Sequence, residues 1–317
     1  MSNELGMKNI NRQTRGLLLI ILWFLFACSK EEPAIFVDLS KREPVRLEAE
    51  KNVITYAYLP QYAHTVSYKR HHPMVEYLRA ETGLNVRQIF PDTFDQHMKM
   101  VGRGEIDISF SNPFIYTKLS HRYGARAFAR IVETGNREKF RGQIICRADH
   151  TGIKTLSDCR GKRWIAVDPT SAGGYLYPLG HFIASGVKKE DFAEIAFAPG
   201  PGGKQEKVVL AVYSGKFDFG TIREGTLAVV GDKIDISGIR VVANTRWYPG
   251  WVYSARADLD FETVEAIRSA LVRLKIEDSR HRKILEAAKF IRVIPSTDED
   301  FDPIRKLSVL AGISLLE

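Results

Sequence analysis

The chain has 317 residues, 44% of them hydrophobic and 26% charged, with a formal net charge of +8. That composition is ordinary for a globular protein, and it excludes a disordered, collagen-like or disulfide-rich chain. The length is sufficient for two lobes, each with its own core.

Residues 1–27 have the layout of a secretory signal. Three basic residues precede the apolar run 17–27, which is too short to cross a bilayer as a helix. The run ends at Leu25-Phe26-Ala27-Cys28, which resembles the bacterial lipobox. We therefore expect 1–27 to be a lipoprotein-type signal peptide, Cys28 to be lipidated, and 28–50 to be a tether. An uncleaved anchor and a plain signal are the alternatives, and translation could start at Met1 or Met7.

The charge indicates an anionic partner. The first 27 residues hold three basic residues and one acidic residue, which leaves +6 for the rest of the chain. An extracytoplasmic, membrane-anchored location argues against nucleic acid, so a small anion or a negatively charged membrane surface is favoured. Cys146 and Cys159 stand in apolar contexts. Buried free thiols are favoured for this pair, although an oxidising compartment permits a disulfide.

Strand and helix patterns alternate from residue 53 onward. Strands are predicted at 53–58, 85–90, 106–110, 142–147, 164–167, 217–221, 240–243 and 251–254. Helices are predicted at 73–82, 113–121, 176–185, 204–214, 261–276 and 279–288, with one more that Asp92 caps and that carries Phe94, Met98 and Val101. This alternation predicts an α/β fold with mostly parallel sheets and helices on both faces.

Ligands of such sheets collect beyond the carboxyl ends of the strands. Three of these ends are Tyr58-Leu59-Pro60, Phe90-Pro91-Asp92 and Ser111-Asn112-Pro113. A fourth is the stretch Asp168-Pro169-Thr170-Ser171-Ala172-Gly173-Gly174-Tyr175, which joins a predicted strand to a predicted helix. Its backbone N–H groups, its hydroxyls and the helix dipole suit a phosphate-like or carboxylate-like anion. An ordinary helix N-cap is the alternative.

Catalytic and metal motifs are not supported. The run Gly200–Gln205 resembles a P-loop but lacks the first glycine and the Ser/Thr after the lysine, so a loop before a helix is expected. The adjacent His71 and His72, with Glu76, are expected to flank a helix rather than hold a metal. Structural roles are expected for Asp107 and Asp218. We expect neither enzymatic activity nor a metal or cofactor.

A set of ordered segments carries a family resemblance. They are Pro73–Leu78, Gly104–Ile108, Asn112–Tyr116, Gly152–Lys162, the 168–175 stretch, Tyr248-Pro249-Gly250 and Asp298–Arg305. Over about residues 50–306 they resemble the phosphonate- and phosphite-binding proteins of bacterial ABC importers. The resemblance implies a type II periplasmic-binding fold whose two lobes close on a ligand. Lobe 1 would be 51–143 plus 252–317, lobe 2 would be 144–251, and hinge strands would lie near 143–147 and 243–252.

The resemblance also implies the ligand contacts. Thr170, Ser171 and the N–H groups of Ala172, Gly173 and Gly174 would form an oxyanion cradle. Ala172 replaces a Thr of the relatives, which removes one hydroxyl donor. Further contacts are expected from Tyr58, Ser111, Asn112 and Tyr175.

Other cleft positions depart from the relatives. Gln205 stands where relatives have an anion-binding His, and Phe94 where they have a cleft Tyr. Glu224 falls near a carboxylate that holds an amine in relatives, whereas Trp251 replaces a second one. Arg246, Trp247, Tyr248 and Trp251 therefore suggest an aromatic or cationic wall, with hinge and core packing as the alternative.

The implied function is that of a monomeric, lipid-anchored solute-binding protein. It would capture phosphonate, phosphite or phosphate and deliver it to an ABC permease. The alternative is a periplasmic sensor that signals to a membrane histidine kinase, possibly for a different oxyanion. A synthase-like enzyme on the same fold is a third hypothesis.

Overall fold

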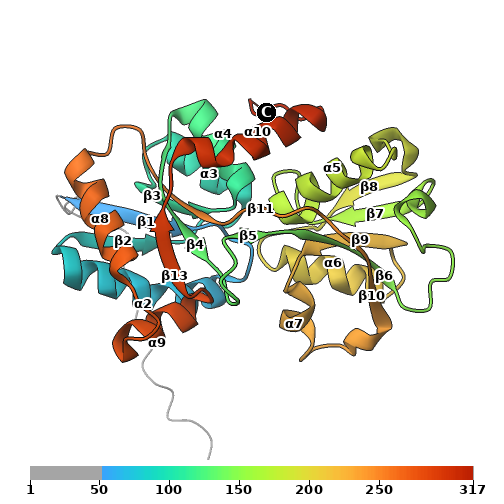
Figure 1. Cartoon of the computed structure of the whole chain (residues 1–317), viewed down its shortest axis with the longest axis horizontal. Helices are drawn as coiled ribbons and strands as arrows, with labels where there is room; N and C mark the ends of the chain where they lie inside the picture. Colours follow the sequence, from blue (N-terminus) through green and yellow to red (C-terminus); the bar gives the residue numbers. More distant parts are fainter. Residues whose placement is uncertain (1–51, 317) are drawn as a thin grey trace, which may run out of the picture. The chain divides into compact units, whose positions relative to one another are not determined.

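The structure, a computed structural model, describes residues 52–316. The expected signal peptide, the tether and Cys28 lie outside these residues. The described chain forms two separate larger β-sheets, each with its own helices, and a small two-stranded sheet (Figure 1). No helix within 52–316 is both long enough and apolar enough to span a bilayer.

The first lobe is built on a six-stranded sheet in the order β13-β4-β12-β3-β1-β2. Its strands are β1 (Val53–Tyr58), β2 (Asn85–Ile89), β3 (Ile108–Ser111), β4 (Arg126–Val132), β12 (Val252–Ala255) and β13 (Arg292–Pro295). Strand β1 runs parallel to β2 and β3, whereas β12 is antiparallel to β3 and β4, and β13 to β4.

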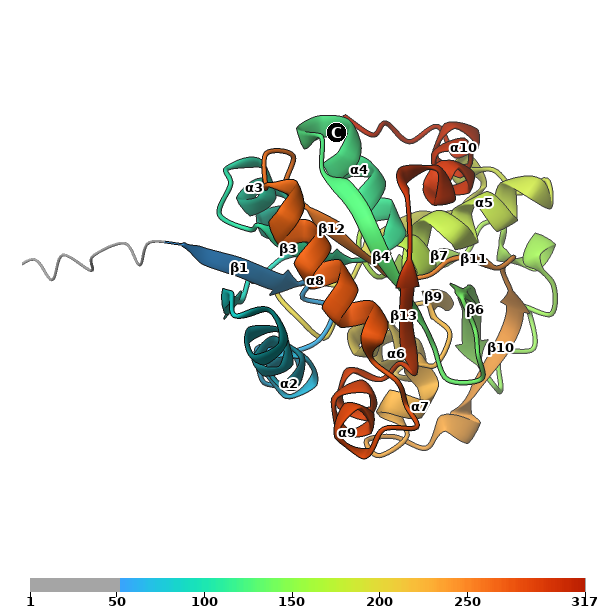
Figure 2. The ribbon, with the colours of Figure 1, turned by 60° about the vertical axis from the view of Figure 1, so that its left-hand side comes forward.

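Helices cover both faces of this sheet, as Figure 2 shows. They are α2 (His64–Thr82), α3 (Phe94–Gly102), α4 (Pro113–Tyr123), α8 (Phe261–Arg273), α9 (Ser279–Ala288) and α10 (Asp302–Leu310). Helices α2 and α8 both contact strands of the sheet. Helix α2 also packs against α8 and α9, while α4 packs on β12 and contacts α3 and α10.

The second lobe is built on a five-stranded sheet in the order β10-β6-β9-β7-β8. Its strands are β6 (Gly142–Arg147), β7 (Arg163–Ala166), β8 (Glu194–Phe197), β9 (Phe219–Arg223) and β10 (Ile239–Asn244). Its α-helices are α5 (Tyr177–Ala184), α6 (Lys204–Tyr213) and α7 (Thr226–Val230). Two cores form, one with Leu179 and Phe182 of α5 and one with Val208, Val209 and Val212 of α6, so apolar faces are buried on both sides of the sheet.

The chain passes between the two sheets twice. The outward segment carries β5 (Lys139–Phe140) and the return segment carries β11 (Tyr248–Pro249), and these two short strands pair antiparallel. The exact lobe limits remain a prediction. The α/β class with two sheets is confirmed. Most strands of each sheet run in the same direction, but β12 and β13 in the first lobe and β6 in the second run against their neighbours, so both sheets are mixed.

Two of the predicted helix starts are wrong. Helix α2 begins at His64, nine residues before the expected start, and Pro73 lies inside it. The buried His71 shares a hydrogen bond of 2.7 Å with the Tyr56 hydroxyl, so tertiary contacts hold the first half of the helix despite the proline. Helix α3 is capped by Thr93, whose side chain accepts the Gln96 N–H, and not by Asp92.

Cys146 and Cys159 are both buried and free.

Buried histidines make stability depend on pH. His97 of α3 is fully buried beside Ser109, with 2.7 Å between Nε2 and Oγ, and burial lowers its pKa to about 3. The unfolded chain takes up that proton near pH 6.5, so it binds more protons than the folded chain between about pH 6.5 and 3.

We therefore expect the free energy of unfolding to fall as the pH drops from 7 towards 4. His97→Gln should flatten this dependence, as measured by urea unfolding at pH 7 and pH 5. His121→Gln, at an exposed position of α4, is the matched control. The same slope in His97→Gln and in the parent protein would contradict this prediction.

Candidate ligand-binding site

The stretch 168–175 forms the strand–turn–helix arrangement that the sequence predicts, with one addition. A single turn of π-helix, Ala172–Leu176, lies between β7 and α5. Ser171 is its N-cap, and Ser171 Oγ accepts the Gly174 N–H at 3.1 Å. The motif is therefore a helix cap, and the other N–H groups at the start of this turn lack partners inside it.

Asp168 fixes the start of the turn through its side-chain contacts. Its Oδ1 accepts the Thr170 N–H at 2.9 Å and the Thr170 hydroxyl at 2.7 Å, while its Oδ2 pairs with Lys204 Nζ at 2.5 Å. The Thr170 hydroxyl hydrogen is thus committed to Asp168. Ser171 Oγ is an acceptor in its cap, so its own hydrogen stays available for a ligand.

Residues of both lobes press on the turn. Thr221 Oγ1 of β9 donates to the Gly174 carbonyl at 2.6 Å. From the first lobe, Asn112 caps α4 and its Nδ2 donates to the Thr170 carbonyl at 3.4 Å. A Cβ placed on Gly173 would lie 3.4 Å from the Cα of Arg223, so the π-turn packs directly against the end of β9.

Aromatic and polar side chains gather at strand ends of the first lobe. The ring centroid of Trp251 lies 5.6 Å from that of Tyr58 and 5.3 Å from that of Phe110. Val252 pairs with Ser111 in the sheet, so Trp251 comes next to the end of β3. Within the described residues, Ser111 Oγ and Trp251 Nε1 are buried without a hydrogen-bond partner. Each unmet group costs about 1–3 kcal/mol, which a bound acceptor would recover.

Arg223, at the end of β9, carries charge into this cluster. Its guanidinium pairs with Glu133, which follows β4 of the first lobe, and lies 5.9 Å from the Trp251 ring centroid. Burial lowers the pKa of Arg223 from its ordinary value, and its Nε is buried without a partner among the described residues. Gln205 Oε1 accepts the Arg223 N–H at 2.9 Å. Through that contact Gln205 fixes the backbone of Arg223.

Two cavities flank this region. The smaller, of about 30 Å³, is lined by Tyr58, Arg223, Glu133 and Trp251 among others. The larger, of about 620 Å³, is lined in part by Thr170, Tyr175 and Lys204. Phe94 is buried nearby, with Lys204 Nζ 5.9 Å from its ring centroid. Of the predicted contacts, Tyr58 lines the smaller cavity, and Thr170 and Tyr175 line the larger one.

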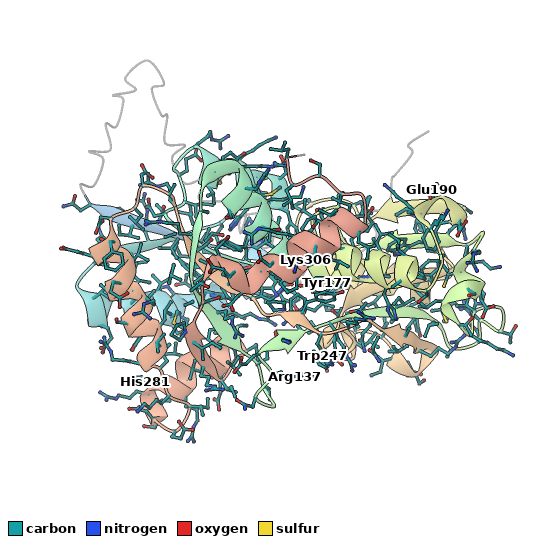
Figure 3. The ribbon with its side chains drawn as sticks, turned by 45° about the horizontal axis from the view of Figure 1, so that its top comes forward. Arg137, Tyr177, Glu190, Trp247, His281 and Lys306 are labelled. Carbon is teal, nitrogen blue, oxygen red and sulfur yellow. The ribbon has the colours of Figure 1, made fainter. Side chains whose placement is uncertain are left out.

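Glu224 does not join them. It pairs with Arg141 at 2.7 Å and with Arg137 at 3.4 Å. Trp247 packs over the same arginines, and Figure 3 shows Trp247 beside Arg137 at the connection between the sheets. Tyr248 likewise stacks on Tyr177, with 4.2 Å between centroids. Hinge packing therefore accounts for Trp247 and Tyr248, whereas Trp251 faces the candidate site.

The remaining polar candidates have structural contacts. Asp107 accepts the Thr55 N–H and pairs with Arg256, and Asp218 accepts the Arg163 N–H. The glycine-rich run before α6 is a loop. The part of the chain that the structure describes contains no cluster of three or more metal-ligating side chains.

Sequence reasoning missed Arg223 and Glu133, although Arg223 is adjacent to a residue it selected. The one available signal is position, because Arg223 follows a predicted strand and therefore lies at the sheet edge where ligands collect.

A family model and a known relative match most of the chain. The family model described as "ABC transporter, phosphonate, periplasmic substrate-binding protein" matches residues 56–301. The phosphate-import protein PhnD of Mycolicibacterium smegmatis is 24% identical over 290 residues, which cover 86% of this chain and 90% of that protein.

Solved structures have the same fold. PhnD1 of Prochlorococcus marinus in complex with methylphosphonate has a TM-score of 0.71 at 16% identity, covering 81% of this chain and 97% of that one. A binding component of an ABC phosphonate transporter from Pseudomonas aeruginosa has a TM-score of 0.72 at 18% identity, covering 82% and 86%.

Proposed function

Because the chain belongs to the periplasmic substrate-binding proteins of phosphonate ABC transporters, we propose that it captures a small phosphorus oxyanion between its lobes and delivers it to a membrane permease. Phosphonate, phosphite and phosphate are the candidate ligands. The main support is that Ser111, Trp251 and Arg223, at strand ends of the two lobes, have buried donors with no hydrogen-bond partner among the described residues.

The proposed donors contact the ligand in different ways. The N-terminus of the π-turn and the Ser171 hydroxyl would hold the phosphoryl oxygens, and Arg223 would supply the charge. Micromolar affinity requires about 8 kcal/mol. A helix dipole contributes only about 0.3–1 kcal/mol, whereas hydrogen bonds to charged groups contribute about 1.5–3 kcal/mol each. Arg223 is therefore the group that makes such affinity attainable.

Lobe closure would exclude water from the site. Asn112 to Thr170 is a contact between the lobes that lies beside the proposed ligand position. Its formation would couple binding to closure, as expected for domain closure around a ligand. A permease that recognises the closed form would then receive only loaded protein.

Related proteins support the ligand class and the destination. One relative is named as a phosphate-import protein, and one neighbour was solved with methylphosphonate. The match to a transporter family supports transport rather than the kinase-signalling or enzymatic alternatives. We further propose a periplasmic location, membrane attachment through a lipid on Cys28, and a monomeric state.

Calorimetric titration of the purified protein with phosphate, phosphite and methylphosphonate tests this proposal. A saturating ligand at 100 times its Kd should stabilise the fold by about 2.7 kcal/mol, visible as a higher Tm. If none of the three binds and none raises the Tm, the proposed ligand class is wrong.

Ser171→Ala should weaken binding of that ligand by about 10- to 100-fold, because one hydroxyl donor and the cap of the π-turn are lost. Thr155→Ala is the matched control, since Thr155 bonds Asp158 in the capping box of a short 3₁₀-helix of the same lobe, Leu156–Cys159. That control should leave the affinity unchanged. Equal losses in the two variants would mean that Ser171 acts through lobe stability alone.

A further inference from the structure

Three basic side chains line the smaller cavity. Arg223 enters it from the second lobe and Arg70, on α2, from the first. The exposed Lys289 also lines it. Among the described residues, Glu133 is the one carboxylate that lines this cavity.

Arg70 brings a charge that no ion pair within residues 52–316 neutralises. Its guanidinium carbon lies 4.3 Å from the ring centroid of Tyr62. Burial lowers the pKa of His71, and the charge of Arg70 lowers it further. Burial raises the pKa of Tyr58, and the charge of Arg70 opposes that increase. Across residues 52–316, ion pairs involve Arg223 and Glu133, but none involves Arg70.

The other polar groups of the cavity do not offset this charge. Burial lowers the pKa of His71 to about 3 and raises that of Tyr58 to about 12, so both are neutral at pH 7. Glu133 balances Arg223 alone. The cavity therefore keeps a net positive charge beside the rings of Tyr58, Phe110 and Trp251, and an added anion would be favoured there.

We propose that Arg70 forms a second anion-binding subsite together with Arg223, which lies between this subsite and the phosphoryl group, and that the physiological ligand carries a second negatively charged group, such as a carboxylate, a few bonds from its phosphorus. This inference rests on the proposed function, in which the phosphoryl group sits at the N-terminus of the π-turn. Gly173 of that turn packs against the Cα of Arg223, and the Arg223 side chain lines the cavity of the second subsite, so this one residue connects the two subsites.

Glu133 has a definite role in this scheme. Its carboxylate already occupies the position beside Arg223 that a ligand carboxylate would take. A cavity of about 30 Å³ has room for one water-sized group, so the Glu133 side chain turns away when the ligand enters. Glu133 then acts as a resident counter-ion that competes with the ligand.

An amine at the organic end of the ligand would be repelled at this subsite. It would be placed against two arginine side chains, and like charges in such a site repel. The subsite therefore selects against aminoalkylphosphonates as well as for ligands with two anionic groups.

Titration calorimetry with phosphonoacetate, methylphosphonate and 2-aminoethylphosphonate tests the inference on the parent protein. Phosphonoacetate should bind about tenfold more tightly than methylphosphonate, the gain from one added charge-assisted contact. 2-Aminoethylphosphonate should bind most weakly. Equal affinities for the first two, or the tightest binding for the amine, would overturn the second subsite and leave the proposed function standing. Absence of binding by all three, and by phosphate and phosphite, would overturn both.

Variants then assign the effect to residues. Arg70→Gln should remove the advantage of phosphonoacetate while methylphosphonate affinity changes by less than about threefold. Lys69→Gln, an exposed neighbour on the same helix, changes the net charge equally and should leave the advantage intact. Glu133→Gln should strengthen phosphonoacetate binding, because it removes the competitor. Weaker phosphonoacetate binding in Glu133→Gln, with the melting temperature unchanged, would show that Glu133 supports the ligand, and the inference would be wrong.

Discussion

Gly174→Ala should destabilise the protein by about 3 kcal/mol, at the upper end of the range for overpacking, and should weaken ligand binding by at least tenfold. An added Cβ would lie 2.3 Å from Val167 Cγ2 and 2.9 Å from Ser171 Oγ. Val167 is fully buried, so it cannot move aside cheaply. The turn must shift instead, and the shift carries away the Ser171 hydroxyl and the first N–H groups of the π-turn.

Urea unfolding and calorimetric titration measure the two effects separately. Gly152→Ala is a matched control in the same lobe, because its added Cβ would meet only the His150 ring, at 3.3 Å. It should change both quantities little. If Gly174→Ala unfolds at the urea concentration of the parent protein, the turn has freedom to relax that its contacts in the structure do not suggest.

The local part of the site could be read from the sequence, because it depends on neighbouring residues. A strand, a hydroxyl- and glycine-rich turn and a helix follow each other at 163–184, and each has its own pattern. The π-turn itself was not predictable. Its carbonyl at Gly174 accepts from Thr221, some 47 residues away, and a one-residue change of hydrogen-bond register leaves no local pattern.

Arg223 shows a different limit. The predicted strand 217–221 ended two residues before the observed end of β9 at Arg223. Successive side chains of a strand point to opposite faces, so the choice between Arg223 and Glu224 depends on the pairing of β9 with β6, where Arg223 stands opposite Gly142. That pairing joins distant segments. Sequence reasoning selected the carboxylate that turned out to bond Arg141 on the connection.

The antiparallel strands could not be predicted for the same reason, because their direction depends on pairing between distant segments. The alternation of strands and helices predicts parallel neighbours within each consecutive group, and β1, β2 and β3 agree. Strand β12 returns from the second lobe and enters between β3 and β4, against the direction of both. Nothing in the composition of Val252–Ala255 indicates direction, because antiparallel and parallel strands bury the same residue types when both faces are covered.

Trp164→Ala should be the most destabilising of these substitutions, lowering the free energy of unfolding by about 3–5 kcal/mol. Trp164 of β7 is fully buried, and its ring centroid lies 5.1 Å from that of Phe192 and 5.5 Å from that of Phe182. Its Nε1 donates to Thr221 Oγ1 at 2.9 Å, and the same hydroxyl donates to the Gly174 carbonyl at 2.6 Å. The core of the second lobe and the ligand turn are therefore joined by one chain of hydrogen bonds.

Trp164→Phe separates the two contributions. It keeps most of the apolar contact but leaves Thr221 Oγ1 without its donor, so we expect about 1–2 kcal/mol of lost stability and a several-fold loss of affinity for the oxyanion. Thr221 would be free to rotate, and the Gly174 carbonyl would lose the contact that fixes the turn. A Trp164→Phe protein that binds as tightly as the parent would show that aromatic packing alone positions the turn. Reduced affinity at nearly full stability would show that the hydrogen-bond chain sets the geometry of the anion site from within the core.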